Sequence, residues 1–253
     1  MKGVILAGGT GSRLKPFTQI INKHLLPVGP YPMIYWPIFK LREAGIQEIL
    51  IITNKKDLSS FIKVLGDGKE LRVNLYYEIQ RDEGAGIADS LRCAKSFIGE
   101  EKFIAILGDN IFKDTLTPYI QAFLKQEKGA RVLLKEVKDL SRYGVPQLDD
   151  EKKRVKSIIE KPVHPPSSFC VTGIYMYDKK VFNFINTIHP SIRNEFEITE
   201  VNNLYAKKNE LQFDILKGWW ADAGTHESLY QAAQFVNDEK TVEDDTTWKN
   251  TSL

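Results

Sequence analysis

The sequence predicts an α/β fold in which a mixed, mainly parallel sheet is flanked by helices. Two observations lead to this prediction. In the first half of the chain, apolar runs of strand length alternate with helical patterns, which is typical of βαβ units. Glycine-containing turns follow the first and the fourth of these runs, at Gly8 and Gly108. Because the carboxyl ends of parallel strands meet at one edge of a sheet, we expect ligand-binding residues to collect there.

The first half contains four predicted strands, each a run in which apolar residues predominate. These strands cover residues 4–7, 48–53, 72–80 and 102–107. Between them we expect helices over residues 33–44 and 57–65, each followed by a glycine, which commonly ends a helix because it adopts a positive φ without strain. A further helix is expected over residues 87–98, where apolar side chains recur at helical spacing.

The second half changes character, with short predicted strands separated by turns. These strands cover residues 130–137, 144–148, 155–160 and 169–177. They are followed by helices over 179–187 and 197–207, a strand over 211–216 and a last helix ending near residue 237. No repeat or linker divides the chain. We therefore expect one domain over residues 1–237, with a parallel core and an antiparallel lobe, and a polar tail over residues 238–253.

Composition and charge exclude several classes of protein. An apolar content of 42% and a charged content of 27% are ordinary for a globular protein in water. The net charge of +2 provides no reason to expect a nucleic acid or a membrane surface as partner. No apolar run approaches the roughly 18 residues of a membrane helix, and the first run is too short for a secretory signal. Cys93 and Cys170 lack C-x-x-C spacing, so we expect reduced thiols and a cytoplasmic protein.

The stretch over residues 2–23, KGVILAGGTGSRLKPFTQIINK, carries the strongest functional signal. Glycines at positions 8, 9 and 11 come directly after the first predicted strand, and Arg13, Lys15 and Lys23 follow them. Glycine lets backbone N–H groups approach a ligand closely, and the cations can neutralise phosphate oxygens. We interpret the stretch as a phosphate-binding loop, the alternative being a tight turn between strand and helix.

Two common phosphate-binding motifs do not fit this loop. A dinucleotide fingerprint requires glycine at position 14, where the chain has leucine, and an acidic residue after the second strand, where residues 53–56 read TNKK. A Walker A motif requires G-x-x-x-x-G-K followed by Ser or Thr, and no stretch near the N-terminus matches it. The four histidines show no spacing typical of metal ligands.

Several short motifs follow one another along residues 1–237. They are LAGGTGSRLKPFT at 6–18, NKHLLPV at 22–28, LGDNIF at 107–112, RYGV at 142–145, EKP at 160–162, VTGIY at 171–175, FEIT at 196–199 and WADAGTH at 220–226. Together they resemble the signature of the sugar-nucleotidyltransferases, and most closely that of the glucose-1-phosphate thymidylyltransferases. The resemblance implies the Rossmann-like nucleotide-diphospho-sugar transferase fold. It also implies a nucleotide-binding half over about residues 1–128 and a smaller sugar-binding half over about 129–237.

The resemblance further implies an enzyme that transfers a thymidylyl group from dTTP to α-D-glucose 1-phosphate, giving dTDP-glucose and pyrophosphate. The sugar phosphate is already an anionic nucleophile, so catalysis would consist of positioning and charge neutralisation, with Mg²⁺ as cofactor. Two alternatives stay open: a uridylyltransferase that uses UTP, and a nucleotide-sugar-binding regulatory subunit without activity. The chain ends soon after residue 237, as in a short form without the family's C-terminal helical extension, so we expect a homodimer or a monomer.

Roles for individual residues follow from the same resemblance. The catalytic cations would be Arg13, Lys23 and Lys161. The nucleotide would be bound by Leu6, Gly8, Gly9, Gly11, Gln80, Gly86 and Asp109. The sugar phosphate would be bound by Tyr143, Gly144, Glu160, Lys161, Val171 and Arg193, and Mg²⁺ by Asp109 and Asp222.

The chain departs from the expected pattern on both sides of this site. On the nucleotide side, Gln80 and Gly86 are one residue further apart than expected, and Asp89 stands where an amide or Glu is usual. On the sugar-phosphate side, Asn194 replaces an expected glycine and Glu200 an expected Asp. We therefore expect the loop between Gln80 and Gly86, which the resemblance implies to contact the base, to differ in shape from the family's pattern.

Overall fold

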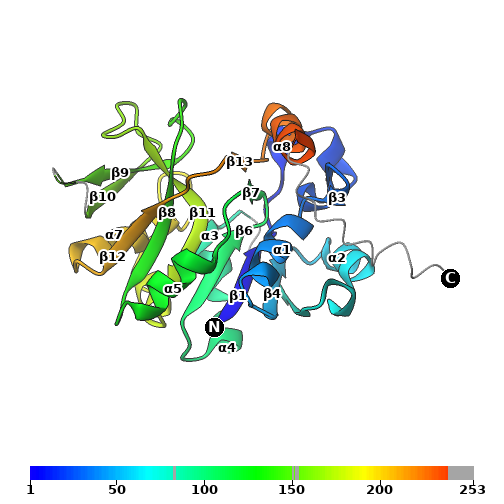
Figure 1. Ribbon diagram of the computed structural model, residues 1–253, viewed down its shortest axis with the longest axis horizontal. Coiled ribbons are helices and arrows are strands. Elements are labelled where there is room, and N and C mark those ends of the chain that lie inside the picture. Colours follow the sequence, from blue (N-terminus) through cyan, green and yellow to red (C-terminus); the bar gives the residue numbers. More distant parts are fainter. Residues whose placement is uncertain (82–83, 150, 152–153, 239–253) are drawn as a thin grey trace.

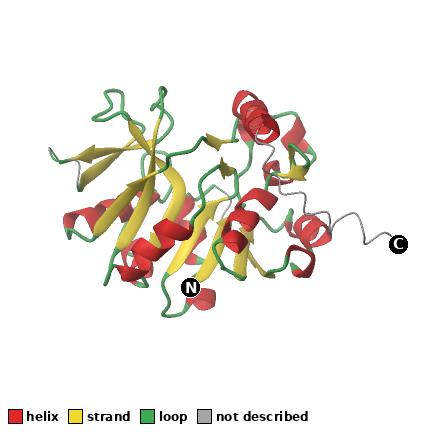
Figure 2. Ribbon diagram, viewed as in Figure 1, coloured by secondary structure: helices red, strands yellow, loops and turns green. Residues whose placement is uncertain are grey.

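A seven-stranded sheet runs through the middle of the molecule, with helices on both of its faces (Figure 1 and Figure 2). The computed structural model describes residues 1–81, 84–149, 151 and 154–238. In spatial order, the strands of the sheet are β12 (Leu211–Ile215), β8 (Ala130–Glu136), β11 (Phe169–Tyr177), β6 (Phe103–Leu107), β1 (Lys2–Leu6), β4 (Glu48–Thr53) and β5 (Asn74–Ile79).

The sheet is mixed and mainly parallel, as the sequence predicts. Strands β6, β1, β4 and β5 run parallel to one another, and so do β12 and β8, whereas β11 is antiparallel to both of its neighbours. Strand β1, between β6 and β4, is buried on both faces, with Val4 and Leu6 in one hydrophobic cluster and Ile5 and the next residue after the strand, Ala7, in the other. A continuous apolar run is what a parallel strand covered on both faces requires.

Two layers of helices cover the sheet. The face that carries Ile5 is covered by α1 (Tyr35–Glu43), α2 (Leu58–Leu65) and α5 (Thr117–Lys125). The face that carries Val4 is covered by α3 (Ile87–Arg92), α4 (Lys95–Ile98), α6 (Lys180–Ile185) and α7 (Ile198–Lys207). The helices turn apolar side chains to the sheet at helical spacing. In α2, for example, Phe61 and Leu65 are buried and lie one turn apart.

The smaller antiparallel lobe is present as predicted, and the strands of the second half are divided between it and the main sheet. Strands β8, β11 and β12 extend the main sheet, and β9 (Gly144–Leu148) and β10 (Val155–Glu160) form a separate antiparallel pair at one end of the molecule in Figure 1. The burial of β11 explains why this strand belongs to the main sheet. This strand is buried at every position from 170 to 177, so both of its faces need cover, which the interior of a large sheet provides.

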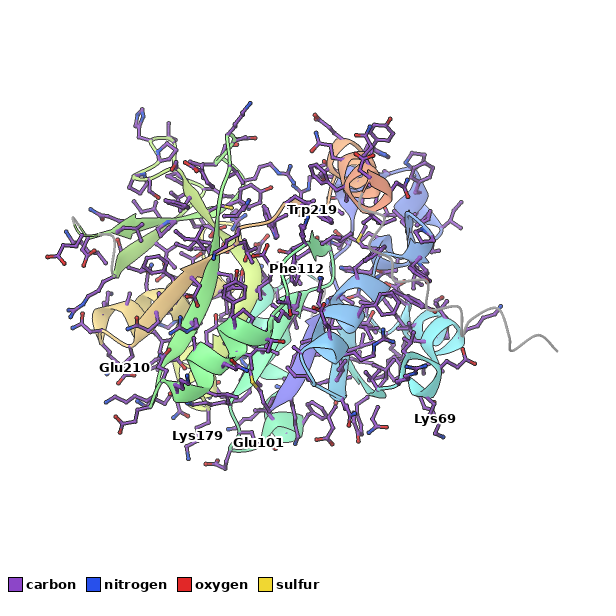
Figure 3. All side chains as sticks on the ribbon, viewed as in Figure 1. Lys69, Glu101, Phe112, Lys179, Glu210 and Trp219 are labelled. Atoms are coloured by element: carbon purple, nitrogen blue, oxygen red, sulfur yellow. The ribbon has the colours of Figure 1, made fainter. Side chains whose placement is uncertain are left out.

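Several short elements lie outside what the sequence predicts. They are β2 (Pro27–Val28), β3 (Tyr31–Pro32), β7 (Asn110–Phe112), β13 (Trp220–Asp222) and helix α5, and the helix expected over residues 87–98 is divided into α3 and α4. Strand β7 pairs with β13, and Figure 3 shows Phe112 and Trp219 near each other at the centre of the molecule. The last helix, α8 (His226–Asp238), packs through Ala232 and Val236 against Val28.

Three expectations about the whole chain can be compared with the structure. Among the described helices, none is both long enough and apolar enough to cross a membrane. Cys93 and Cys170 are free thiols, as expected. The predicted polar tail, apart from Asp238 at the end of α8, lies outside the described residues.

Candidate active site

The glycine turn after β1 lies at the carboxyl edge of the sheet. Leu6 ends β1 and is buried, and the side chain of Gln80, which follows β5, reaches the turn. Gln80 Nε2 donates to the Gly8 carbonyl at 3.2 Å, and a Cβ atom at position 8 would lie only 1.9 Å from Gln80 Oε1. Gly11 has a φ of 65° and leads into a short 3-10 helix, Ser12–Leu14, that carries Arg13. A side chain at position 8 would thus displace the Gln80 side chain, and position 11 has a positive φ that glycine adopts without strain.

A buried ion pair joins the loop after this turn to the end of β6. Lys23 begins a 3-10 helix, Lys23–Leu25, whose N-terminus is capped by the side chain of Asn22. Its Nζ atom lies 2.5 Å from Asp109 Oδ2 and close to Gly9, whose missing Cβ would be 3.2 Å from Lys23 Cε. Burial raises the pKa of the Asp109 carboxyl, but several opposing contributions, the charge of Lys23 first among them and the hydrogen bonds from Lys23 and Asn110 with it, together outweigh burial and hold that pKa well below its usual range. Asp109 is therefore ionised.

The second predicted metal ligand lies next to the first. In the β7–β13 pair, Asp222 is opposite Asn110, the residue after Asp109. Burial, and then the negative charge of Asp109, raise the pKa of Asp222, while Arg142 Nη2 donates to Asp222 Oδ2 at 2.9 Å. A Cβ atom on Gly224 would lie 2.9 Å from Asp222 Oδ1 and 3.6 Å from Asp109 Oδ2. The two carboxylates thus converge on the space that this glycine leaves open.

These two carboxylates fit Mg²⁺, which prefers hard oxygen ligands. Within the described residues there is no group of three or more His, Cys, Asp or Glu side chains that could hold a metal ion. Mg²⁺ usually binds through one or two carboxylates and completes its coordination with phosphate oxygens and water. The donor set at this position therefore suits a magnesium ion that arrives with a triphosphate, rather than one held by the protein alone.

A cavity of about 200 Å³ extends from these carboxylates toward β9 and β10. Arg13, Asp109 and Asp222 line it, and so does every residue predicted to bind the sugar phosphate. Those residues are Tyr143, Gly144, Glu160, Lys161, Val171 and Arg193. They come from β9, β10, β11 and the loops beside them, which places the sugar-phosphate residues and the carboxylate pair in one hollow.

Glu160, the last residue of β10, is an acidic residue in the lining of this cavity. Thr199 Oγ1 donates to Glu160 Oε2 at 2.5 Å, and burial raises the pKa of Glu160 although this hydrogen bond acts in the opposite direction. A Cβ atom on Gly144 would lie 3.3 Å from the same oxygen, so the glycine leaves room beside the carboxylate. Glu160 can therefore accept hydrogen bonds from hydroxyl groups placed in the cavity.

Lys161 turns sharply away from the end of β10. Its φ of 47° is unusual for a residue with a side chain, and its backbone N–H donates to the Tyr143 carbonyl at 2.9 Å. The Lys161 ammonium lies 4.0 Å from Glu160 Oε1, and the Lys161 side chain is 40% exposed. The backbone conformation thus directs a cation to the rim of the cavity, where it can meet an anionic ligand.

Arg193 is surrounded by carboxylates. Its Nη2 atom lies 2.7 Å from Glu197, 3.3 Å from Glu160 and 3.5 Å from Glu195. The next residue, Asn194, has a φ of 60°, a conformation that asparagine tolerates better than most residues, which explains how it can replace the expected glycine. A sugar phosphate that binds Arg193 must therefore compete with carboxylates already in place.

Most residues predicted to bind the nucleotide lie beside the cavity rather than in its lining. Arg13 and Asp109 line it, whereas the lining does not include Leu6, Gly8, Gly9, Gly11, Lys23, Gln80 or Gly86. Gly86 connects the two regions, because its φ is 100° and its missing Cβ would lie 2.5 Å from the Phe196 carbonyl. Ile87, the next residue, lines the cavity. Of the loop between Gln80 and Gly86, residues 82 and 83 lie outside the described part of the chain.

Sequence reasoning missed several residues that line the cavity. Asn110 is the clearest case, because its Oδ1 accepts from Gly173 N and from Trp220 Nε1, both at 2.8 Å, while its Nδ2 donates to Asp109 at 3.1 Å. The others with a clear contact in the site are Arg142, Glu197 and Thr199. All of them stand inside motifs quoted above, so motif membership was the available signal, but the contacts of Asn110 with Gly173 and Trp220, of Arg142 with Asp222 and of Thr199 with Glu160 join residues that are distant in sequence.

A family model described as nucleotidyl transferase matches residues 2–239. The chain belongs to this family. A glucose-1-phosphate thymidylyltransferase from Neisseria meningitidis serogroup A / serotype 4A is 40% identical over 260 residues, which cover 99% of this chain and 90% of the relative. The family expected from the ordered motifs is therefore confirmed.

Solved structures support the same assignment. The crystal structure of a Bacillus anthracis protein described as a glucose-1-phosphate thymidylyltransferase, in complex with a sucrose, is 47% identical and has a TM-score of 0.89. The match covers 94% of this chain and 96% of that one. A UDP-glucose pyrophosphorylase complexed with UDP-glucose has a TM-score of 0.84 at 23% identity, over 94% of this chain and 99% of that one, a likeness of fold alone. The predicted nucleotide-diphospho-sugar transferase fold is thus confirmed.

Proposed function

We propose that this protein is a Mg²⁺-dependent glucose-1-phosphate thymidylyltransferase, which converts dTTP and α-D-glucose 1-phosphate into dTDP-glucose and pyrophosphate. The observation that carries the proposal is the arrangement of one cavity. One part of it is lined by a cation and a carboxylate pair, Arg13, Asp109 and Asp222, and the rest by residues suited to a sugar phosphate. The relatives described above support the choice of substrates.

The reaction is a single displacement at phosphorus. A phosphate oxygen of glucose 1-phosphate forms a bond to the α-phosphorus of dTTP, and the bond between that phosphorus and the oxygen bridging to the β-phosphate breaks. Pyrophosphate leaves with the electron pair. The nucleophile is already ionised, so no side chain has to remove a proton. Positioning and neutralisation of charge account for the catalysis.

The activating side of the site consists of the glycine turn and the residues around it. Backbone N–H groups of Gly8, Gly9 and Gly11 bind the triphosphate, Arg13 neutralises its β- and γ-phosphates, and Lys23 bridges the α-phosphate and the leaving pyrophosphate. Asp109 and Asp222 hold the Mg²⁺, which neutralises phosphate charge when bound. Leu6, Gln80 and Gly86 contact the nucleoside.

The acceptor side consists of the cavity wall between β9 and α7. Glu160 accepts hydrogen bonds from sugar hydroxyls, beside Tyr143, Gly144 and Val171. Lys161 and Arg193 bind the phosphate of the sugar, and Arg193 exchanges a carboxylate contact for a phosphate contact as it does so. The division into a nucleotide half over residues 1–128 and a sugar half over 129–237 follows these roles. Asp222 belongs to the second half by its position in the sequence, but it lies next to Asp109 of the first half.

The decisive experiment measures pyrophosphate release from dTTP and glucose 1-phosphate in the presence of Mg²⁺. We expect release that matches dTDP-glucose formation and stops when the metal is chelated. A folded protein that binds dTDP-glucose but releases no pyrophosphate would instead be the regulatory subunit considered above. Competition between dTTP and UTP separates the thymidylyl from the uridylyl reaction. Cytoplasmic location and a homodimeric or monomeric state stay predictions.

A further inference from the structure

A buried polar network lies beside the glycine turn and connects the ends of β4 and β5 with α2. Asn22 Nδ2 donates to Asp57 Oδ2 at 2.7 Å, and Asn54 Nδ2 donates to the same oxygen at 3.4 Å. Asn54 Oδ1 in turn accepts from Gln80 Nε2 at 2.5 Å. Asn54 is 1% exposed and Gln80 is 6% exposed. The side-chain amide of Gln80 is therefore held by groups inside the protein.

Groups that can only accept determine the direction of these hydrogen bonds. A carboxylate oxygen accepts hydrogen bonds, so Asp57 faces the amide nitrogen of Asn54, and Asn54 turns its oxygen toward Gln80. The Gly8 carbonyl, also only an acceptor, lies 3.2 Å from the same Gln80 nitrogen. Both N–H bonds of the Gln80 amide are thus used within the protein. The network therefore fixes the orientation of the Gln80 amide, with its nitrogen toward Asn54 and its oxygen on the other side of the amide group.

The Gln80 oxygen shares its hydrogen-bond donor with a second acceptor. Ser90 Oγ lies 3.1 Å from this oxygen and also 3.1 Å from the Gly86 carbonyl, and its single hydrogen can serve one of them at a time. Within the part of the chain that the structure describes, no second donor to Gln80 Oε1 is present. The oxygen lies at the glycine turn, where the side chain of residue 8 would begin. A buried acceptor without a full set of donors favours a ligand that supplies one.

We propose that Asn54 is a positioning residue that makes Gln80 select a pyrimidine with an N3–H group, thymine or uracil, over cytosine. This inference rests on the proposed function, in which Gln80 contacts the base. Thymine and uracil carry a hydrogen on N3 and can donate it to the Gln80 oxygen. In cytosine, N3 bears a lone pair, which would face that oxygen. The network does not separate thymine from uracil, because these two bases differ at C5 and not at N3.

The test compares Asn54→Leu with the unaltered protein. Leucine has a similar volume but offers no acceptor, so the Gln80 amide becomes free to turn its nitrogen toward the base. Calorimetric titration measures the binding of dTTP, UTP and dCTP, and kcat/KM is measured for each with glucose 1-phosphate. The unaltered protein should prefer dTTP and UTP over dCTP by more than about 100-fold, since a site built for a hydrogen bond rejects a base that lacks it. In Asn54→Leu this ratio should fall at least about tenfold. An unchanged ratio in the folded variant overturns the inference.

Two further variants control this experiment. Ser90→Ala removes the shared donor but leaves the Asn54 contact, so the preference for dTTP and UTP should be kept. A loss of preference in Ser90→Ala overturns the inference, and this test does not depend on whether Asn54→Leu folds. Asn183→Leu, at an exposed position of α6, should leave the ratio unchanged. A fall there equal to that in Asn54→Leu would show a nonspecific effect and also overturn the inference.

Gln80→Ala separates this inference from the proposed function. If Gln80→Ala loses the preference while Asn54→Leu keeps it, Gln80 reads the base but Asn54 does not position it. If Gln80→Ala binds the three nucleotides as the unaltered protein does, the base contact in the proposed function is wrong and the inference fails with it. Loss of the preference in both variants, with Ser90→Ala and Asn183→Leu unaffected, supports the inference.

Discussion

Lys23 Nζ lies 2.5 Å from Asp109 Oδ2, although 86 positions separate the two residues in the chain. Only 12% of the lysine side chain and 8% of the aspartate side chain are exposed. The pair connects the loop after the glycine turn to the end of β6. A cation and a predicted metal ligand are therefore held together before any substrate binds, which avoids the cost of arranging them during the reaction.

Replacing Lys23 should impair both turnover and stability. We expect Lys23→Met to lower kcat by about 100-fold or more, because charge that develops on the leaving pyrophosphate loses its cation. The free energy of unfolding should fall by roughly 3 kcal/mol, because Asp109 becomes a buried charge without its partner. Steady-state kinetics and urea unfolding measure the two effects. Lys63→Met, at an exposed position of α2, is the matched control. Similar kcat values for both variants would contradict the role given to Lys23.

Adding a methyl group at Gly224 should disturb the carboxylate pair. The new Cβ would lie 2.9 Å from Asp222 Oδ1 and 3.0 Å from Arg13 Nη2, so the carboxylate has to move and the guanidinium is crowded. We expect Gly224→Ala to lower kcat/KM by at least about tenfold and to raise the Mg²⁺ concentration needed for half-maximal activity, because metal sites demand accurate ligand geometry. A magnesium titration of the activity is the measurement. An unchanged titration curve would place the metal elsewhere.

The buried His24 should make stability depend on pH. Burial, with the positive charge of Lys23 next in importance, lowers the pKa of His24 from 6.5 to about 3. Between these values the unfolded chain binds a proton that the folded chain does not, so stability is full above pH 6.5 and falls as the pH decreases toward 3. His24 should thus contribute a loss of about 2 kcal/mol between pH 7 and pH 5.

Urea unfolding at several pH values tests this contribution. The slope of the unfolding free energy against pH should be smaller in His24→Gln than in the unaltered protein, because glutamine does not titrate. His164 is exposed and provides the matched substitution, His164→Gln, which should keep the slope. Equal slopes in the two variants would show that His24 is not the group responsible.

The carboxylates around Arg193 should weaken the binding of glucose 1-phosphate. Glu195 is the most distant of the three, at 3.5 Å, and is partly exposed. Glu195→Gln removes one negative charge beside the proposed phosphate site, so KM for glucose 1-phosphate should fall roughly two- to fivefold, the effect of one partly exposed ion pair. Glu127→Gln, at an exposed position after α5, is the control. An increase of this KM in Glu195→Gln would mean that Glu195 holds Arg193 in its binding position.

Local patterns predicted the main elements of the fold because those elements are long enough to show them. The apolar runs of β1, β4 and β6 and the helical spacing in α2 and α7 are visible without a partner. Strands β7 and β13 have three residues each, too few for a period, and Asn110 and Trp220, which contact across them, are 110 positions apart. Their pairing becomes apparent only in the folded chain.

The same limit applies to the site. Motifs in their order along the chain indicated Arg13, Asp109 and Asp222, but not that Asn110 and Arg142 hold these carboxylates. The smaller antiparallel lobe was predicted, but the sequence shows only that β11 is apolar and not that this strand belongs to the main sheet. The elements that pack against a strand come from distant parts of the chain, so the strand's own sequence does not identify them.

The sequence by itself determined the chemistry. Glycines after a buried strand, cations behind them and two aspartates in distant motifs are residue types suited to phosphates and a hard metal ion. The tertiary structure alone decided which of these groups meet. The Lys23–Asp109 pair, the space at Gly224 and the link from Asn54 to Gln80 all depend on strand pairing and helix packing between residues far apart in the chain. Such contacts arise from the burial of whole elements, which no local pattern records.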